Sequence, residues 1–347
     1  MNKFNLQNII RNNVKAMKAY SSARDEYVSD GSKMVFLDAN ENPFENGVNR
    51  YPDPQQRNLK TVIAEQKGVN VNQILLGNGS DEVLDLLFRA FCEPKEDNVI
   101  TLPPTYGMYT VLSNLNEIEE RKVQLQDDFQ PNVEAILKAV DANSKMLFIC
   151  SPNNPTGNLI SYKKIKELLD SYNGLIVIDE AYIDFSEQES WIKELKNHAN
   201  LVVTQTLSKA YGLAGIRLGL CYASAEIIEV LNKIKPPYNV NELTQKRALE
   251  RVLNVDAVKA EITSILEERE ILIEALSKVE FVSKIYDSEA NFILAKVDNA
   301  TKRYNDLLAK GIVIRNRTTQ ALCENTLRFT VGTKEENKQL IQTLNSI

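Results

Sequence analysis

The sequence predicts an α/β fold with a mostly parallel sheet covered by helices, followed by a smaller α+β unit. Three observations lead to this prediction. Short β-rich runs alternate with helix-like segments over the first part of the chain, as in proteins whose parallel strands are joined by helices. The runs are apolar throughout, as expected of strands covered on both faces. After about residue 224 the alternation stops, and a long helical stretch follows.

The expected strands of the larger unit are "NVITL" near 98, "RKVQL" near 121, "KMLFIC" near 145, "GLIVID" near 174, "LVVTQT" near 201 and "RLGLCY" near 217. The helical stretch runs from about Glu242 to Val279, with apolar residues at helical spacing. Three later runs, "FVSKIY", "NFILAKV" and "TLRFTV", have the character of strands, and helices are expected at about 301–310 and 334–346. We therefore expect a large domain over residues 32–240, and an N-terminal arm (1–31) joined with a small domain (241–347).

Composition excludes several classes of protein. The 347 residues include 41 Lys+Arg and 47 Asp+Glu, for a formal charge of -6, and the basic residues are scattered, so a nucleic-acid partner is not expected. Neither a signal peptide nor a membrane-spanning apolar run is visible, and we expect a soluble, cytoplasmic protein. The four cysteines show no C-x-x-C spacing and are expected to be reduced core residues.

The only histidine, His198, argues against Ser-His-Asp triads, Cys-His dyads and H-E-x-x-H zinc sites in their usual forms. Its surroundings, "LKNHANL", predict a surface loop residue. No metal site is predicted. If the chain is an enzyme, we expect its acid-base group to be a lysine, a tyrosine or a carboxylate.

The first polar motif at the end of an apolar run is "GNGSDE", residues 77–82. In open α/β sheets the loops at the carboxyl ends of strands form the ligand crevice. A helix-like segment follows this motif, so Ser80 or Asp81 could cap a helix whose N-terminus faces an anion. The motif is no dinucleotide fingerprint, because Glu82 stands where the third glycine of G-x-G-x-x-G belongs. Taken alone, it is also consistent with an ordinary capped turn.

Three further polar motifs follow expected strands. "SPNNPTGN" places Asn154 after "KMLFIC", although Asn-Pro-Thr-Gly also forms tight turns by itself. "VIDEAYIDF" puts Asp179 and Tyr182 at the end of the next strand, where a buried carboxylate needs a cationic or proton-donating partner. "TLSKAYGLAGIRLG" brings Lys209 among small residues, with Arg217 beside a further strand.

This set of residue types matches the polar groups of pyridoxal phosphate. A lysine with the ordinary pKa of about 10.4 is no nucleophile near neutrality, and lowering that pKa by ~3 units corresponds to ~4 kcal/mol. Schiff-base formation with an aldehyde cofactor is one use of such a lysine. The cofactor's aldehyde, phosphate, phenolic oxygen and ring nitrogen find counterparts in Lys209, the "GNGSDE" helix start with Ser208 and Arg217, Tyr182 with Asn154, and Asp179.

"SPNNPTGN", "DEAY" and "TLSKAYGLAGIRLG", in this order, resemble the motifs of the class I/II (fold type I) pyridoxal-phosphate-dependent aminotransferases, and the similarity spans nearly the whole chain. The resemblance implies that Lys209 bonds to the cofactor aldehyde and then moves a proton between the substrate Cα and the cofactor. Asp179 would keep the pyridine nitrogen protonated, while Tyr182 and Asn154 would bind the phenolic oxygen. The remaining cofactor contacts implied are Tyr106 of "PPTYGMY" on the ring, Thr206, and Ser80, Asp81, Ser208 and Arg217 around the phosphate.

Other motifs resemble the histidinol-phosphate aminotransferase branch of this family: "AYSSAR", "LDANENPF", "RYPDPQ", "GNGSDE" and "VIRNRTTQALCENTLRFTVGT". That branch interconverts L-histidinol phosphate and 2-oxoglutarate with imidazole-acetol phosphate and L-glutamate in histidine biosynthesis. The resemblance implies that Tyr20, Arg315 and Arg328 hold the substrate phosphate, with Asn154 also near the substrate. Arg328 would take the glutamate α-carboxylate in the other half-reaction, since guanidinium groups bind both anions. Tyr51 would reach the cofactor phosphate of the second subunit of a homodimer.

Three alternatives remain open on the sequence. An aromatic amino acid aminotransferase of the same fold would share every cofactor residue. A phosphothreonine decarboxylase on the same scaffold would release carbon dioxide and need no keto acid. A cofactor-binding regulator without turnover is the third alternative, which the absence of a basic patch disfavours.

Overall fold

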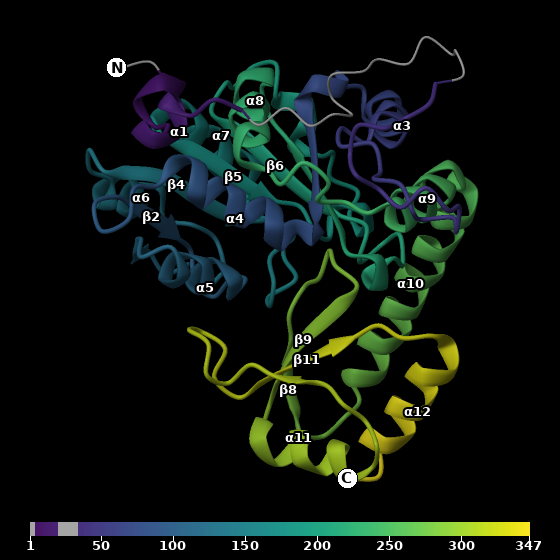
Figure 1. Cartoon of the computed structure of the whole chain (residues 1–347). Coiled ribbons are helices and arrows are strands. Elements are labelled where there is room, and N and C mark those ends of the chain that lie inside the picture. The colour runs from purple at the N-terminus through teal and green to yellow at the C-terminus, as the bar shows by residue number, and fades with distance from the viewer. Residues whose placement is uncertain (1–3, 20–33) are drawn as a thin grey trace.

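The computed structural model describes residues 4–19 and 34–347, which form two β-sheets (Figure 1). The larger sheet has seven strands in the order β1-β7-β6-β5-β4-β2-β3. Its strands are β1 (Ile74–Asn78), β2 (Asn98–Thr101), β3 (Glu119–Lys122), β4 (Ser144–Cys150), β5 (Leu175–Asp179), β6 (Leu201–Thr206) and β7 (Leu218–Tyr222). Strands β3, β2, β4, β5 and β6 pair in parallel, and β7 lies antiparallel between β6 and β1. The predicted mostly parallel sheet is confirmed.

Helices cover both faces of the larger sheet because its strands are apolar on both sides. In β4, Leu147 and Ile149 pack on one face, in the same core as residues of α3, α6, α7 and α9. Met146 and Phe148 point to the opposite face, toward α1, α4, α5 and α8. These helices are α1 (Asn12–Ala16), α3 (Arg57–Lys67), α4 (Gly79–Phe91), α5 (Met108–Leu115), α6 (Val133–Ala139), α7 (Tyr162–Ser171), α8 (Ala225–Ile234) and α9 (Glu242–Leu253).

Strand β3 departs from the expectation that every strand is apolar. It consists of Glu119–Lys122, with the sequence Glu-Glu-Arg-Lys, and its side chains are partly or fully exposed. Among the described strands, it lies at the edge of the sheet and pairs with β2. Charged side chains are typical of edge strands, because they discourage pairing with another chain.

The helical stretch predicted from about Glu242 to Val279 is present, and two helices occupy it. Helix α9 ends at Leu253, and α10 spans Val255–Leu276. Asn254 separates them with φ -90° and ψ 59°, which is outside the helical region. The break lets α9 pack on α3, while α10 runs on to the smaller sheet and contacts its strands (Figure 1).

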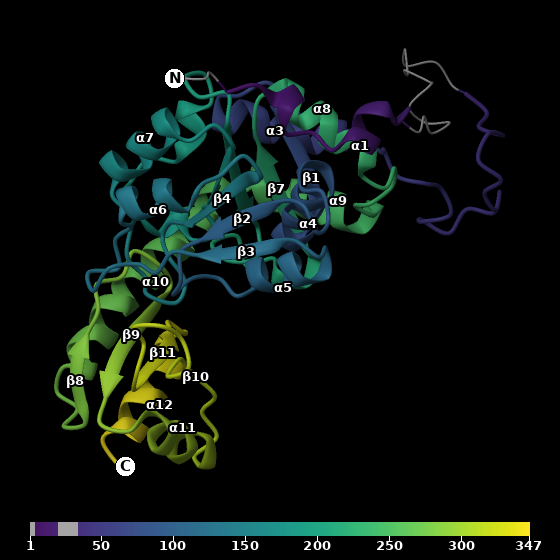
Figure 2. The same cartoon turned by 90° about the vertical axis from the view of Figure 1, so that its left-hand side faces the viewer.

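The smaller sheet is antiparallel, with the order β10-β11-β9-β8. Its strands are β8 (Val282–Ile285), β9 (Phe292–Val297), β10 (Arg315–Asn316) and β11 (Thr326–Thr330). Helices α10, α11 (Ala300–Ala309) and α12 (Lys334–Leu344) pack apolar side chains against this sheet. The sheet and these helices form a separate unit next to the larger sheet (Figure 2). Three of these strands and the last two helices agree with the sequence prediction, whereas β10 was not predicted.

The topology brings four chain segments together at one edge of the larger sheet. Cys150, Asp179 and Thr204 lie side by side at the carboxyl ends of β4, β5 and β6. The start of α4 joins them, because the Gly79 amide donates to the Arg217 carbonyl at 3.0 Å beside β7. The polar motifs that follow β1, β4, β5 and β6 therefore share one edge.

In the described ranges, no helix combines the length and apolarity that crossing a membrane requires. All four cysteines are free and buried, as expected. Burial raises the pKa of each thiol, so the four side chains stay protonated at neutral pH.

Gly219 is the closest point between β7 and the start of α4. A Cβ atom at this position would lie 2.2 Å from the Gly79 carbonyl carbon and 2.2 Å from the Ser80 amide nitrogen. Both neighbours are backbone atoms, which cannot rotate away. We expect Gly219→Ala to destabilise the protein by at least about 1–3 kcal/mol, measured as a lower urea midpoint. Gly107→Ala is the control, since Gly107 has φ -67° and open space around it; an equal loss in both variants would contradict the prediction.

Candidate active site

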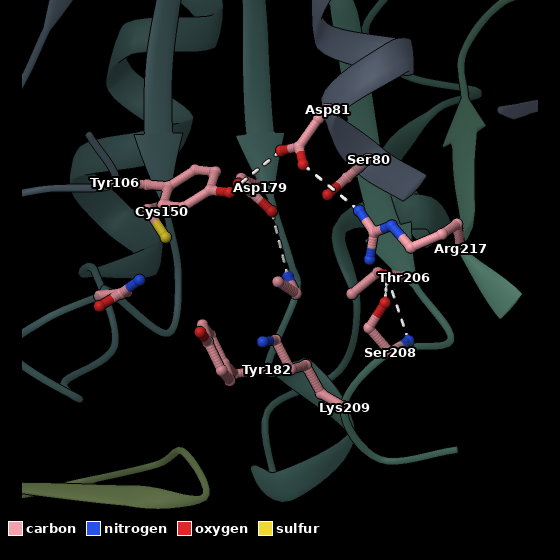
Figure 3. Close-up of a pocket in the computed structure, with 12 residues that line it drawn as sticks. Ser80, Asp81, Tyr106, Cys150, Asp179, Tyr182, Thr206, Ser208, Lys209 and Arg217 are labelled. Carbon is pink, nitrogen blue, oxygen red and sulfur yellow. Dashed lines mark hydrogen bonds and ion pairs between the residues drawn. The ribbon is translucent and has the colours of Figure 1, made fainter. Parts of the chain in front are cut away.

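One cavity opens at the carboxyl edge of the larger sheet (Figure 3). Its lining includes ten of the eleven residues that the sequence analysis assigned to a cofactor. The lining residues are Ser80, Asp81, Tyr106, Cys150, Asn154, Asp179, Ala181, Tyr182, Thr206, Ser208, Lys209 and Arg217. Cys150 and Ala181 were not predicted. Cys150 ends β4 and pairs with Asp179 in the strand register, and Ala181 lies between Asp179 and Tyr182 just after β5.

Asp179 is a buried carboxylate at the end of β5, with 2% of its surface exposed. The Tyr109 hydroxyl donates to its Oδ2 at 2.9 Å, and the Ala181 amide donates to its Oδ1 at 3.2 Å. No lysine or arginine of the described chain forms an ion pair with it. Burial raises the pKa of Asp179 to about 6, although the Tyr109 hydrogen bond opposes the rise.

Tyr109 is the proton-donating partner that a buried Asp179 requires, and sequence reasoning missed it. The residue lies in α5, fully buried, and its ring stacks on Phe148. Tyr106, which was predicted, precedes it by three residues, so the two rings lie on one side of the same turn and meet edge to face. The second tyrosine of "PPTYGMY" was therefore the available signal.

Lys209 follows β6 in a tight turn and faces the cavity, with its ammonium 5.7 Å from the centre of the Tyr182 ring. It makes no hydrogen bond or ion pair with the described residues. Partial burial lowers its pKa, and the charges of Arg328 and Arg217 lower it further. Thr206 and Ser208 shape the turn: the Ser208 amide donates to the Thr206 hydroxyl at 3.1 Å, and that hydroxyl donates to the Leu218 carbonyl at 3.2 Å.

The start of α4 differs from the predicted cap. The helix begins at Gly79 after Asn78, and neither Ser80 nor Asp81 caps it with a side-chain hydrogen bond. Instead, the Asp81 carboxylate accepts from the Tyr106 hydroxyl at 3.0 Å and pairs with Arg217 at 3.4 Å. Gly79 has φ +74°, and a Cβ there would lie 2.5 Å from the Arg217 guanidinium. The glycine lets the guanidinium lie against the helix start.

Arg328 connects the smaller sheet to the cavity. It lies in β11, and its Nη1 donates to the Asn154 side-chain oxygen at 2.5 Å. Burial lowers the pKa of Arg328 to about 10, and the charge of Arg317 is the next cause. Arg315 stands opposite Arg328 in the strand register, but it is exposed. Arg317 is a nearby cation that sequence reasoning did not single out.

Two predicted residues lie elsewhere. Tyr51 is half-exposed and stacks on Tyr238, with ring centres 4.4 Å apart, and it does not line the cavity of its own chain. Tyr20 lies outside the described residues. The cavity itself therefore combines cations, a buried carboxylate and the amide-bearing start of a helix, which suits an anionic ligand with one protonated ring or amine.

The raised pKa of Asp179 predicts that the free energy of unfolding of the ligand-free protein depends on pH. Because the pKa of Asp179 is about 6 in the folded protein and 3.8 when unperturbed, the folded state binds this proton more tightly than the unfolded state does. This contribution to stability is present below about pH 4 and is lost as the pH rises through about 6. Ligand-free Asp179→Asn should therefore be more stable than the wild type at pH 8, by up to about 3 kcal/mol, and the gain should shrink toward pH 4. Urea unfolding across this range measures it; parallel pH profiles for both proteins would sink the idea.

The chain matches the family model described as "Aminotransferase class I and II" over residues 30–344. A histidinol-phosphate aminotransferase of Flavobacterium johnsoniae is 66% identical over 345 residues, with 99% of each chain covered. One of Christiangramia forsetii is 60% identical over 347 residues, which cover 100% of this chain and 99% of that relative.

Solved structures agree with these relatives. The histidinol-phosphate aminotransferase of Clostridium acetobutylicum has a TM-score of 0.80 at 26% identity, covering 86% of this chain and 90% of that chain. The enzyme of Sinorhizobium meliloti, solved in complex with pyridoxal-5'-phosphate, has a TM-score of 0.78 at 21% identity and covers 86% of this chain and 83% of that chain; it supports the fold. With a family model that spans nearly its full length and relatives this similar, the chain belongs to the aminotransferase class I and II family.

Proposed function

We propose that the chain is a pyridoxal-phosphate-dependent aminotransferase that interconverts L-histidinol phosphate and 2-oxoglutarate with imidazole-acetol phosphate and L-glutamate. The observation that carries the proposal is the single cavity in which Lys209, Asp179 and Arg217 meet. The names of the relatives that are 66% and 60% identical over nearly the whole chain support the choice of substrates. We assign the cofactor to a domain of residues 32–240, with residues 1–31 as an arm and residues 241–347 as a small domain, of which α9 packs on the larger sheet.

The cavity fits pyridoxal phosphate at each end of that cofactor. Asp179, a buried carboxylate without a cationic partner in the described chain, suits a protonated ring nitrogen, which would offset its burial cost. At the opposite end the N-terminus of α4, which has no side-chain cap, lies beside Ser208 and Arg217, a combination typical of phosphate sites. Ser80 and Thr206 line the same end of the cavity.

The middle of the cavity suits the ring. Tyr106 is held in place by its hydrogen bond to Asp81, so its ring can stack on the cofactor. We assign Tyr182 and Asn154, which line the cavity, as donors to the phenolic oxygen, and the side chain of Asn154 also accepts a hydrogen bond from Arg328. When bound, pyridoxal phosphate supplies an aldehyde and an electron-withdrawing ring that stabilises negative charge at the substrate Cα.

Lys209 is the residue that we assign to proton transfer. Its Nζ has no partner in the described chain, and its lowered pKa increases the unprotonated fraction near neutral pH. In the proposed reaction Nζ takes the proton from the substrate Cα and returns it on the cofactor side. Burial also raises the pKa of Tyr182, which keeps its hydroxyl protonated as a hydrogen-bond donor during this step.

Arginines suit two substrates that alternate at one site. Arg328, anchored on Asn154, is placed to bind the α-carboxylate of glutamate, and Arg315 stands opposite it on β10. We assign both, together with Tyr20, to the phosphate of histidinol phosphate. Guanidinium groups bind carboxylate and phosphate bidentately, so one set of side chains can serve both anions.

A homodimer is the second part of the proposal. Residues 34–51 extend away from the body of the chain (Figure 2), and Val35, Leu37 and Phe44 are at least 79% exposed there. Exposed apolar side chains on an extended segment favour contact with another chain. Tyr51 ends this segment, outside its own cavity, and we assign it to the cofactor phosphate of the second subunit.

The first test follows the visible absorbance of the purified protein with bound pyridoxal phosphate. Adding L-histidinol phosphate should bleach it, and adding 2-oxoglutarate should restore it. Lys209→Ala should abolish the cycle, with turnover reduced by at least about 10²–10⁴-fold, because no other described lysine borders the cavity. Lys310→Gln, which changes an exposed lysine, should cycle normally.

The same assay separates the alternatives. A strong preference for L-phenylalanine over L-histidinol phosphate would contradict the substrate assignment and favour an aromatic amino acid aminotransferase. Carbon dioxide release from phosphothreonine without a keto acid would favour a decarboxylase. Undiminished turnover by Lys209→Ala would refute the role of that lysine.

Shared active sites predict complementation between two defective chains. Tyr51→Phe should weaken cofactor affinity by about 10–100-fold, the usual cost of a lost hydrogen bond to a charged group, and Lys209→Ala should be inactive. A mixed dimer has one site with both residues intact, so random re-pairing should restore about a quarter of wild-type activity at limiting cofactor. No gain over the separate variants would argue that each site is built from one chain.

A further inference from the structure

Three arginines lie on one face of the smaller sheet. Arg315 of β10 stands directly opposite Arg328 of β11 in the antiparallel register. The ladder continues beyond β10, because the Arg317 amide donates to the Thr326 carbonyl at 2.9 Å. Arg317 is two residues after Arg315, and alternate residues of an extended strand share a face. All three side chains therefore project to the same side.

None of the three has an acidic partner in the part of the chain that the structure describes. Arg328 donates to Asn154, whereas Arg315 and Arg317 make no side-chain hydrogen bond or ion pair with described residues. The Nε atoms of Arg317 and Arg328 are buried without a hydrogen-bond partner. Buried unpaired donors and uncompensated neighbouring charges are both unfavourable, so this arrangement indicates a missing anion.

Arg328 connects the three arginines to the cavity. Arg328 contacts Asn154, which lines the cavity, and its guanidinium lies 5.0 Å from the centre of the Phe292 ring. Phe292 in turn meets Tyr182 edge to face. Arg317 is partly buried, and its charge lowers the pKa of Arg328 more than the charge of Arg315 does. Of the two, Arg317 is the closer electrostatic neighbour of Arg328.

We propose that Arg317 is a substrate-specificity residue that binds a phosphate monoester jointly with Arg315 and Arg328. The inference deepens the proposed function and rests on it for the identity of the substrate. A carboxylate has one charge and two oxygens, which a single guanidinium can satisfy bidentately. A phosphate monoester near neutral pH carries about 1.5–2 negative charges and three acceptor oxygens. Three guanidinium groups that pair with no described carboxylate therefore match the charge and the oxygen count of a phosphate monoester.

The test uses the holoenzyme and an unreactive probe. Glycerol 3-phosphate has a phosphate monoester but no amino group, and glycerol is its matched control. Isothermal titration should show that the wild type binds the phosphate form more tightly. Arg317→Gln should weaken this binding by about 10–100-fold, as expected for a lost charge-assisted contact. Arg317→Lys should recover part of the affinity, and Lys310→Gln, which removes one exposed charge from the same sheet unit, should change nothing.

Steady-state kinetics supply the second measurement. Arg317→Gln should raise the KM for L-histidinol phosphate by about 10–100-fold, with little change in kcat or in the KM for L-glutamate. Unchanged glycerol 3-phosphate affinity, or an equal rise in both KM values, would overturn the inference while leaving the proposed function intact. Failure of the wild type to use L-histidinol phosphate would overturn the proposed function instead, and the titration series would still decide whether Arg317 binds phosphate.

Discussion

The burial of Asp179 is the constraint around which the cavity is built. A carboxylate at the end of a central parallel strand, shielded on both faces, has lost its water and accepts hydrogen bonds from the Tyr109 hydroxyl and the Ala181 amide instead. The strand register then fixes its neighbours, because Cys150 and Thr204 stand level with it on either side. The motifs that follow β4 and β6 must therefore begin next to this carboxylate, which is how Asn154 and Lys209 reach one cavity.

The smaller sheet adds a positive charge, that of Arg328, to the cavity at the edge of the larger sheet. The sheet edge offers a carboxylate and a free amine, while β11 brings Arg328 against Asn154 across the gap between the two sheets. The edge of the larger sheet thus supplies Lys209, and β11 supplies the arginine that we assign to the substrate's anionic group. The contact between Arg328 and Asn154 joins the residues that we assign to the cofactor to those that we assign to the substrate, and α10 contacts both units.

The strand segments along the chain and the position of the cavity could be predicted because the signal is local: an apolar run followed by a polar motif marks the carboxyl end of a buried strand. Asp179, Lys209 and Asn154 each carry that signal. Tyr109 does not, because its partner lies 70 residues away, and only the packing of α5 on the sheet brings them together. His198 was expected on the surface, but only 9% of its surface is exposed, and its Nε2 lies 2.9 Å from the Lys166 ammonium. The sequence of a loop does not reveal whether other parts of the chain pack over it.

The same charges that suit an anionic substrate also influence the amine. Arg328 and Arg217 each lower the pKa of Lys209, and neither arginine is neutralised by a fully buried carboxylate in the described residues. An anion bound at either guanidinium offsets its field, so the Lys209 amine becomes more basic when the site is filled. The pKa of Lys209, which is lowered in the empty site, is therefore expected to rise once an anion is bound, so the basicity of this amine is coupled to anion binding through charge alone.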